Sequence, residues 1–296
     1  MLNTLLVILE QTLLHIPLML GAYISFSLLK VPDLSIESAY VFGALFGSKI
    51  IMGMPGVPIE LTLIAVICAS LLGGALVGLT SSLMTQKAHL PHLLSSIITF
   101  GLFHGINQLI SAPYVSLQQY ANPLTIVTSI QTHPELFTLL FFGLISALVV
   151  FLLFKTQLGY AWAVYGNNPH FFANYGISTN FVFIIGVIVS NALAGLSGYM
   201  FAQSNNFVEI NMGLGKALLC ITALILGKAL YKTKKPFSLT VPLAGTCAYF
   251  ALQQVLLKVG FNLKYFTALQ AAIVLCILIY TYRKKRSHTH IDNLGV

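Results

Sequence analysis

Residues 135–155 read ELFTLLFFGLISALVVFLLFK, and this run decides the class of fold. Between its terminal Glu135 and Lys155 no residue carries a charge. A helix needs about 20 consecutive apolar residues to cross the hydrocarbon core of a bilayer, where its backbone groups pair within the helix. The run therefore predicts a transmembrane helix.

The rest of the chain has the same character. Of its 296 residues, 57% are hydrophobic and only 7% are charged, whereas soluble domains carry roughly 25% charged residues. No soluble fold could bury this much apolar surface, and no long polar linker divides the chain. We therefore predict an all-α polytopic membrane protein with a single domain, residues 1–296, and about nine transmembrane helices. The predicted spans are 4–29, 34–53, 59–84, 92–111, 135–155, 181–203, 210–230, 237–258 and 264–282.

Lysine and arginine indicate the orientation, because cytoplasmic loops carry an excess of these residues. The loop 111–134 has no Lys or Arg, as expected of an outside loop. Placing the C-terminus inside puts eleven of the 15 Lys and Arg residues on the cytoplasmic side: Lys30, Lys87, Lys155, Lys228, Lys232, Lys234, Lys235, Arg283, Lys284, Lys285 and Arg286. The N-terminus is then outside, and 283–296 form a basic cytoplasmic tail. The net charge of +8 reflects this topology rather than binding to nucleic acid.

Two stretches of the chain read alike. Gly21-Ala-Tyr precedes Asp33-Leu-Ser-Ile-Glu37 and a helix rich in small residues, and Gly198-Tyr199 precedes Glu209-Ile-Asn-Met-Gly213 and a similar helix. This repeat relates spans 1–4 to spans 6–9. Because the offset is five spans, an odd number, the two halves would have opposite topology, as in many transporters. The alternative is chance similarity between small-residue helices, which pack closely in any membrane bundle.

The segment 156–180 is too polar to cross a membrane and too apolar for a plain loop. Gly159–Tyr165 suggests a short amphipathic helix, Gly166-Asn-Asn-Pro169 a turn, and His170–Tyr175 a second short helix. Such an element would lie across the inner face, either on lipid or in a groove of a soluble partner. Its anchors would be Trp162, Tyr165 and Phe171.

Gly166-Asn-Asn-Pro169, followed by Ala173 and Gly176-Ile177, resembles the coupling segment of permeases of the branched-chain amino acid and ribose class of ABC importers. Within this class the chain is most similar to permeases paired with tryptophan-type substrate-binding proteins. The other segments that carry the resemblance are Pro32–Ile36, Ser190–Gly198 and Asn211–Gly215. One departure is that the family usually has an Arg shortly before Gly-x-Asn, where this chain has Ala161-Trp162-Ala163.

The resemblance implies a permease subunit of an ATP-driven importer in the bacterial inner membrane, working by alternating access as a homodimer. A cytoplasmic ABC ATPase that binds ATP and Mg would dock on the coupling segment, and an extracytoplasmic substrate-binding protein would deliver the solute, by analogy an amino acid. The residues implied in coupling are Trp162, Tyr165, Gly166, Asn167, Asn168, Pro169 and Gly176. The chain itself has no GxxxxGK[ST] phosphate loop, so we expect it to bind no cofactor.

Polar residues within the spans are candidates for a translocation path, because such groups are costly in lipid. His104, Asn107 and Gln108 lie together in span four, where they would line a cavity or bond between helices. Asp33, Ser35 and Glu37 precede or open span two, and Glu209 and Asn211 open span seven. These residues would lie near the two mouths of the path, or simply cap helices. Lys216 would snorkel outward or pair with Glu209.

Other functional classes find less support. The sequence shows no Ser-His-Asp set, paired catalytic carboxylates or HExxH motif, and its four Cys lie in apolar runs without the CxxC spacing of a metal site. We therefore expect neither an enzyme nor a metal site. The alternative to an ABC importer is a transporter driven by an ion gradient, which would be expected to keep charged relay residues in mid-membrane, where this sequence has almost none.

Overall fold

The computed structural model describes residues 2–120, 122–125, 134–168, 171–172, 178–231, 237–262, 265–276 and 279. Nearly all of its regular structure is helical. In chain order, the helices are α1 (Leu2–Ala22), the π-helical η1 (Tyr23–Leu28), α2 (Ser35–Gly53), α3 (Ile59–Lys87), α4 (His92–Ile110), the 3₁₀ turn η2 (Pro123–Thr125), α5 (Pro134–Lys155), α6 (Gln157–Asn167), α7 (Thr179–Asn205), α8 (Lys216–Leu230) and α9 (Thr240–Lys258). A further apolar helix spans Phe266–Cys276.

Six helices in the described part of the chain are long and apolar enough to cross a membrane: α1 with η1, α3, α4, α5, α7 and α9. The other three predicted spans also contain helices. The 19-residue α2 carries Glu37 and Lys49 and lies inside the bundle against α3 and α7. The last helix is described only as far as Cys276, except for residue 279. The chain is thus a polytopic helical membrane protein whose helices differ in length.

The predicted start of span seven was wrong. Helix α8 begins at Lys216 and has 15 residues, because residues 210–215 form turns instead of helix. Gly215 has a φ of +82°, a left-handed conformation that glycine adopts easily and that interrupts a right-handed helix. The chain therefore enters α8 partway along the bundle.

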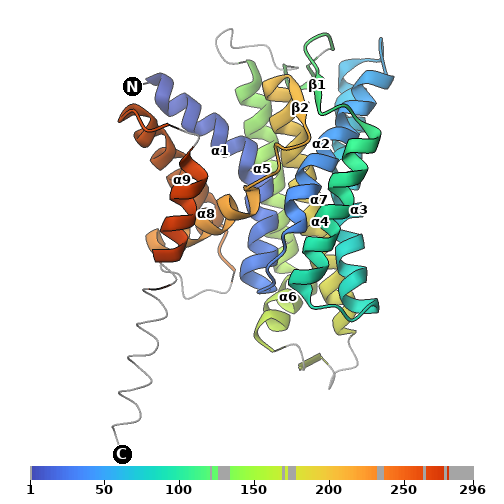
Figure 1. The fold of residues 1–296 in the computed structure, drawn as a ribbon, viewed down its shortest axis with the longest axis vertical. Helices are drawn as coiled ribbons and strands as arrows, with labels where there is room; N and C mark the ends of the chain where they lie inside the picture. The colour runs from blue at the N-terminus through green and yellow to red at the C-terminus, as the bar shows by residue number, and fades with distance from the viewer. Residues whose placement is uncertain are drawn as a thin grey trace, which may run out of the picture.

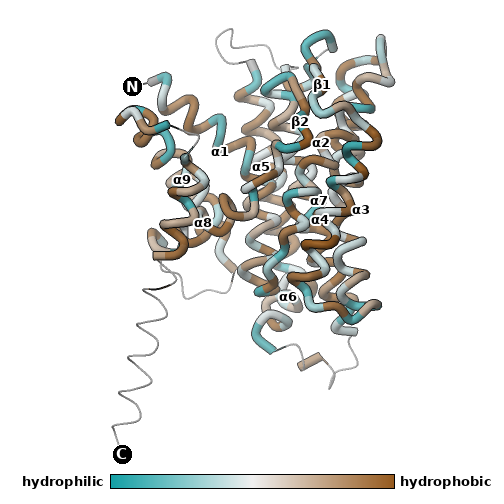
Figure 2. Tube along the Cα trace, viewed as in Figure 1, coloured by the Kyte–Doolittle hydropathy of each residue, from teal (hydrophilic) through white to brown (hydrophobic). Residues whose placement is uncertain are grey.

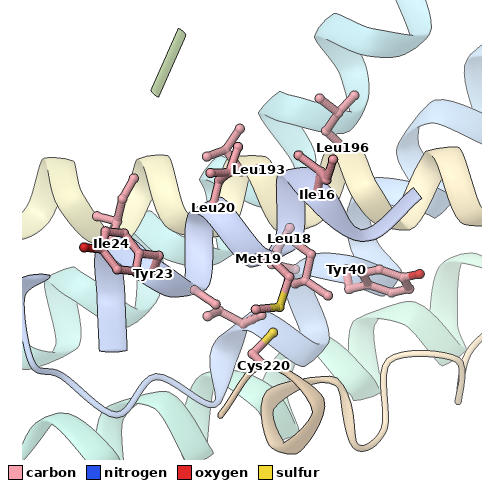
Figure 3. Packing of buried hydrophobic residues seen from close by; sticks show 14 of the residues in the cluster. Ile16, Leu18, Met19, Leu20, Tyr23, Ile24, Tyr40, Leu193, Leu196 and Cys220 are labelled. Carbon is pink, nitrogen blue, oxygen red and sulfur yellow. The ribbon is translucent and has the colours of Figure 1, made fainter. Parts of the chain in front are cut away.

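The core is built around α1 and α7, which α2, α3, α8 and α9 cover. Side chains of α1 pack toward Leu193 and Leu196 of α7 and toward Cys220 of α8 (Figure 3). The outer surfaces of α3, α4 and α5 carry many exposed Leu, Ile and Phe residues. Figure 2 shows hydrophobic residues along these helices and more hydrophilic ones at the two ends of the bundle. This distribution suits a lipid environment.

Two strands depart from the all-α prediction. Strand β1 (Tyr114–Ser116) pairs antiparallel with β2 (Phe207–Glu209), with Val115 opposite Val208. The pairing supplies hydrogen bonds to backbone groups that the helices leave free. The strands lie at one end of the bundle and α6 lies at the other (Figure 1).

Candidate functional site

The carboxylate of Glu37 joins the start of α2 to the start of α8. Its Oε1 accepts hydrogen bonds from the backbone N–H groups of Gly215 at 3.0 Å and Ala217 at 3.1 Å. An acid at a helix N-terminus satisfies N–H groups that have no partner within the helix and is stabilised by the helix dipole. Simple capping by Glu37 of its own helix was one of the two alternatives from the sequence, whereas the structure shows Glu37 capping a helix that begins 179 residues later, at Lys216.

Lys216 neither snorkels outward nor pairs with Glu209. Its Nζ lies 3.0 Å from Nε2 of His15, and 4.8 Å and 4.6 Å from the ring centres of Tyr40 and Phe201. Nδ1 of His15 lies 2.9 Å from the carbonyl oxygen of Gln11, which can only accept a hydrogen bond. The His15 proton is therefore on Nδ1, and Nε2 accepts from the Lys216 ammonium.

A cavity of about 460 Å³ opens beside Lys216. Small-molecule sites typically have volumes of about 300–1,000 Å³. The cavity lies between α1, the end of α7, the turns before α8, α9 and the last helix. Its aromatic lining is Phe201, Tyr249, Phe250 and Phe266, and its amide lining is Gln11, Asn205, Gln253, Gln254 and Gln270.

Asp33, Ser35 and Asn191 form a second polar cluster, which is fully buried. Oδ1 of Asp33 accepts from the backbone N–H of Ser35 at 2.9 Å and from its hydroxyl at 2.5 Å, while Nδ2 of Asn191 donates to Oδ2 at 2.8 Å. Burial raises the pKa of Asp33, and these hydrogen bonds oppose the shift. The cluster fixes the start of α2 against α7.

Helix α6 is held against the end of the bundle by Trp162, which is fully buried. The indole Nε1 donates to the carbonyl oxygen of Val182 at 3.1 Å, and the ring lies beside Gly186 of α7. The sequence suggested that Trp162 anchors the segment on lipid or a partner. Instead it anchors α6 to its own bundle. This position is stable because the apolar ring is removed from water and its single N–H donor has an acceptor.

Two further contacts join α6 to the connection between η1 and α2. Gly166 lies so close to the carbonyl oxygen of Leu28 that a Cβ atom would overlap it. Nζ of Lys30 donates to Oδ1 of Asn167 at 2.5 Å. Tyr165 is half-buried against Phe183, and Asn168 follows α6. The other coupling candidates, Pro169 and Gly176, lie outside the described residues.

None of the eight predicted path residues, including Asp33, Ser35 and Glu37, lines the cavity. His104 and Gln108 share a face of α4 as predicted, with their side-chain nitrogens 3.1 Å apart on an exposed surface. Asn107 is buried, and its Oδ1 has no hydrogen-bond partner in the described part of the chain. Glu209 and Asn211 are exposed at the end of the bundle that carries the strands.

Sequence reasoning missed His15 and the glutamines of the cavity. One signal was available, because Gln11 and His15 are four residues apart and therefore share a face of α1. The structure also brings His15 of α1, Glu37 of α2 and Lys216 of α8 close together, although the centres of the predicted spans contain almost no acidic or basic residues. No pattern within one span indicates such a cluster, since each residue comes from a different helix.

The family model for the permease component of branched-chain amino acid transport systems matches residues 5–278. The chain belongs to this family. This permease is similar to the tyrosine transport system permease protein of Clostridioides difficile, with 30% identity covering 76% of this chain and 73% of the relative. It is also 28% identical to the uncharacterized protein RP368 of Rickettsia prowazekii, covering 88% of this chain and 91% of the relative.

A more distant relative is the autoinducer 2 import system permease protein LsrC of Escherichia coli, with 26% identity over 54% of this chain and 46% of the relative. No solved structure matches the permease. The comparisons and the apolar helices together make the chain a multi-pass membrane protein and a transport component.

Proposed function

We propose that this chain is the membrane subunit of an ATP-driven importer of amino acids in the bacterial inner membrane. It works by alternating access as a homodimer, with a cytoplasmic ABC ATPase and an extracytoplasmic binding protein as partners. ATP and Mg bind to the ATPase, and this chain supplies the path. The resemblance and the family match over residues 5–278 support this assignment.

The observation that carries the proposal is the placement of α6. This short helix lies outside the long helices at one end of the bundle (Figure 1). It is tied to η1 through Leu28, to the connection between η1 and α2 through Lys30, and to α7 through Trp162. Tyr160 is 58% exposed on α6. A helix that touches several spans and presents an exposed aromatic residue suits transmission of movement from a soluble partner.

The predicted orientation is part of the proposal. Lys30 and Lys155 lie at the α6 end, and Lys228 lies near enough to Lys30 for their charges to interact. An excess of positive charge marks the cytoplasmic side, so α6 would face the cytoplasm and the two strands the outside. The basic tail, residues 283–296, lies outside the described part of the chain.

The inverted repeat and the nine spans are also part of the proposal. Residues 29–34 interrupt the chain before α2 at the α6 end, and residues 206–215 interrupt it before α8 toward the strand end. Paired interruptions at opposite ends are expected of an inverted repeat, with the binding site where the broken helices meet. Here the start of α2 meets the start of α8 at Glu37.

The solute is proposed to be an amino acid. The family description names branched-chain amino acid transport and one relative is named for tyrosine. The cluster of His15, Glu37 and Lys216 is the one observation that favours an ion-gradient transporter, because such transporters keep ionisable residues in mid-membrane. The energy source therefore has to be part of the test.

The test compares Tyr160→Glu on α6 with the same change at Tyr114 of β1. The two side chains are 58% and 57% exposed, each contacts one phenylalanine ring, and they lie at opposite ends of the bundle. The tagged permease is co-expressed with an ABC ATPase and an extracytoplasmic binding protein from the same organism. The measurements are the ATPase recovered per permease, and ATP-driven uptake of radiolabelled L-leucine and L-tyrosine in proteoliposomes.

We expect Tyr160→Glu to lose most of the bound ATPase and Tyr114→Glu to retain it. Equal ATPase recovery with both variants would contradict docking on α6. Uptake that follows an imposed ion gradient and ignores ATP would replace the importer with a gradient-driven transporter.

A further inference from the structure

We propose that the cavity beside Lys216 binds the solute, with the Lys216 ammonium holding the α-carboxylate of an amino acid that has an aromatic or large aliphatic side chain. This inference rests on the proposed function and adds to it the substrate class and the residue that recognises it. The argument uses the charge, lining and position of the cavity.

The charge argument concerns the contacts of Lys216. Among the residues that the structure describes, no carboxylate oxygen forms an ion pair with its Nζ; Oε1 of Glu37 instead holds two backbone N–H groups of α8. The ammonium has three donors, and one is used by the neutral His15. The faces of Tyr40 and Phe201, which accept no strong hydrogen bond, also lie against the ammonium. The Glu37 carboxylate lies near enough for its charge to act on Lys216, but it spends its hydrogen bonds on the backbone of α8. A cation with spare donors on a cavity wall is ready to bind an anion.

The lining argument concerns the rest of the solute. Phe201, Tyr249, Phe250 and Phe266 offer aromatic surface to a large apolar side chain. Gln11, Gln253 and Gln254 bring amide oxygens that can accept from a substrate ammonium, and none of the described residues that line the cavity is acidic. A cavity of about 460 Å³ lined by a cation, amides and aromatic rings suits a zwitterionic amino acid with one large apolar side chain.

The position argument concerns access. The lining residues of α1 and α7 lie toward the end that carries β1 and β2, and those of α9 lie in its second half. This end is opposite α6 (Figure 1) and, in the proposed orientation, faces outside. A solute delivered by an extracytoplasmic protein would reach Lys216 from this side.

The test measures binding to the full-length permease in lipid nanodiscs, without ATP. Radiolabelled L-tyrosine, L-phenylalanine and L-leucine are titrated against the wild type, Lys216→Gln, Lys216→Arg and the control Lys49→Gln. Lys49 is an exposed cation on α2 that does not line the cavity, so its variant removes the same charge elsewhere. Tyramine, which lacks the carboxylate of tyrosine, serves as the competitor.

We expect Lys216→Gln to weaken binding by about tenfold or more, because a hydrogen-bonded charge pair is lost. Lys216→Arg should bind more tightly than Lys216→Gln, Lys49→Gln should bind like the wild type, and tyramine should compete poorly. Emission of Trp162, the single tryptophan of the chain, checks that each variant is folded.

Two results would overturn the proposal: equal affinity of Lys216→Gln and the wild type, or no saturable binding of any of the three amino acids at millimolar concentration. Neither depends on the ATPase. If the ATPase docks on α6 and drives uptake while Lys216 proves irrelevant to binding, the importer stands and only this inference fails.

Discussion

Replacing Gly166 by alanine should detach α6 from the connection between η1 and α2. A Cβ at this position would overlap the carbonyl oxygen of Leu28, which is a backbone atom and cannot rotate away as a side chain could. Either α6 or residues 28–30 must therefore move. The bond from Lys30 to Asn167 lies next to the overlap and would be broken or lengthened.

The magnitude follows from two opposing effects. Overpacking a tight contact costs about 1–3 kcal/mol, while replacing glycine by alanine within a helix gains about 0.5–1 kcal/mol. The net range is about 0–2.5 kcal/mol, and we expect a destabilisation in its upper half because the overlapped atom belongs to the backbone. For a chain of this length, each kcal/mol lowers the melting temperature by roughly 2–4 °C.

The assay uses Trp162, the single tryptophan, which lies one helical turn before Gly166 and is fully buried. Movement of α6 would let water reach the indole and shift its emission to the red. The matched control is Gly105→Ala on α4, where an added Cβ meets no atom within 4 Å. It should leave melting temperature, emission and ATPase recovery unchanged or slightly increase stability.

The reasoning would be refuted by Gly166→Ala behaving like Gly105→Ala in all three measurements. If Gly166→Ala shifted the Trp162 emission to the red but left ATPase recovery intact, only the docking part of the reasoning would fail. This result would show that the contact positions α6 but that docking does not need this position.

Further predictions concern the contacts that hold α6 and α2. Trp162→Phe should lower the melting temperature by several degrees, because the carbonyl of Val182 loses a buried donor. Asp33→Ala and Asn191→Ala should each destabilise, and the double variant should cost less than their sum by about 1–3 kcal/mol in a thermal double-mutant cycle. Glu37→Gln should weaken the cap of α8 and slow ATP-driven uptake in proteoliposomes while leaving ATPase recovery unchanged; reduced recovery would contradict this separation.

The sequence predicted the helices well because each apolar run reports the length of its own span. Seven of the nine predicted starts, such as 59 for α3 and 92 for α4, agree with the structure within two residues. The exceptions are the starts of spans seven and eight, which lie at Lys216 and Thr240. Turn formation before α8 depends on tertiary contacts of Glu37 that hydropathy does not record.

The candidate site was harder to predict. The coupling segment 156–180 could be predicted because one contiguous stretch carries both an amphipathic pattern and a family resemblance, and its coupling role stays a prediction. The cavity residues come from five separate parts of the chain, and only their packing brings His15 to Lys216. Trp162 was placed on the wrong side of α6, since its apolar ring fits lipid, a partner and the bundle equally well until the contacts are known.

A short stretch of chain connects α6 to the cavity. Lys30, which binds α6, and Glu37, which caps α8, are seven residues apart, and Asp33 fixes the chain between them to α7. Because α2 is a packed helix, a shift of its first turn moves Glu37 and with it the N–H groups on either side of Lys216. In the proposed mechanism, α2 is therefore the element that links an ATPase docked on α6 to the proposed carboxylate site beside Lys216. Such a mechanism needs two discrete positions of one helix rather than a long chain of side-chain rearrangements.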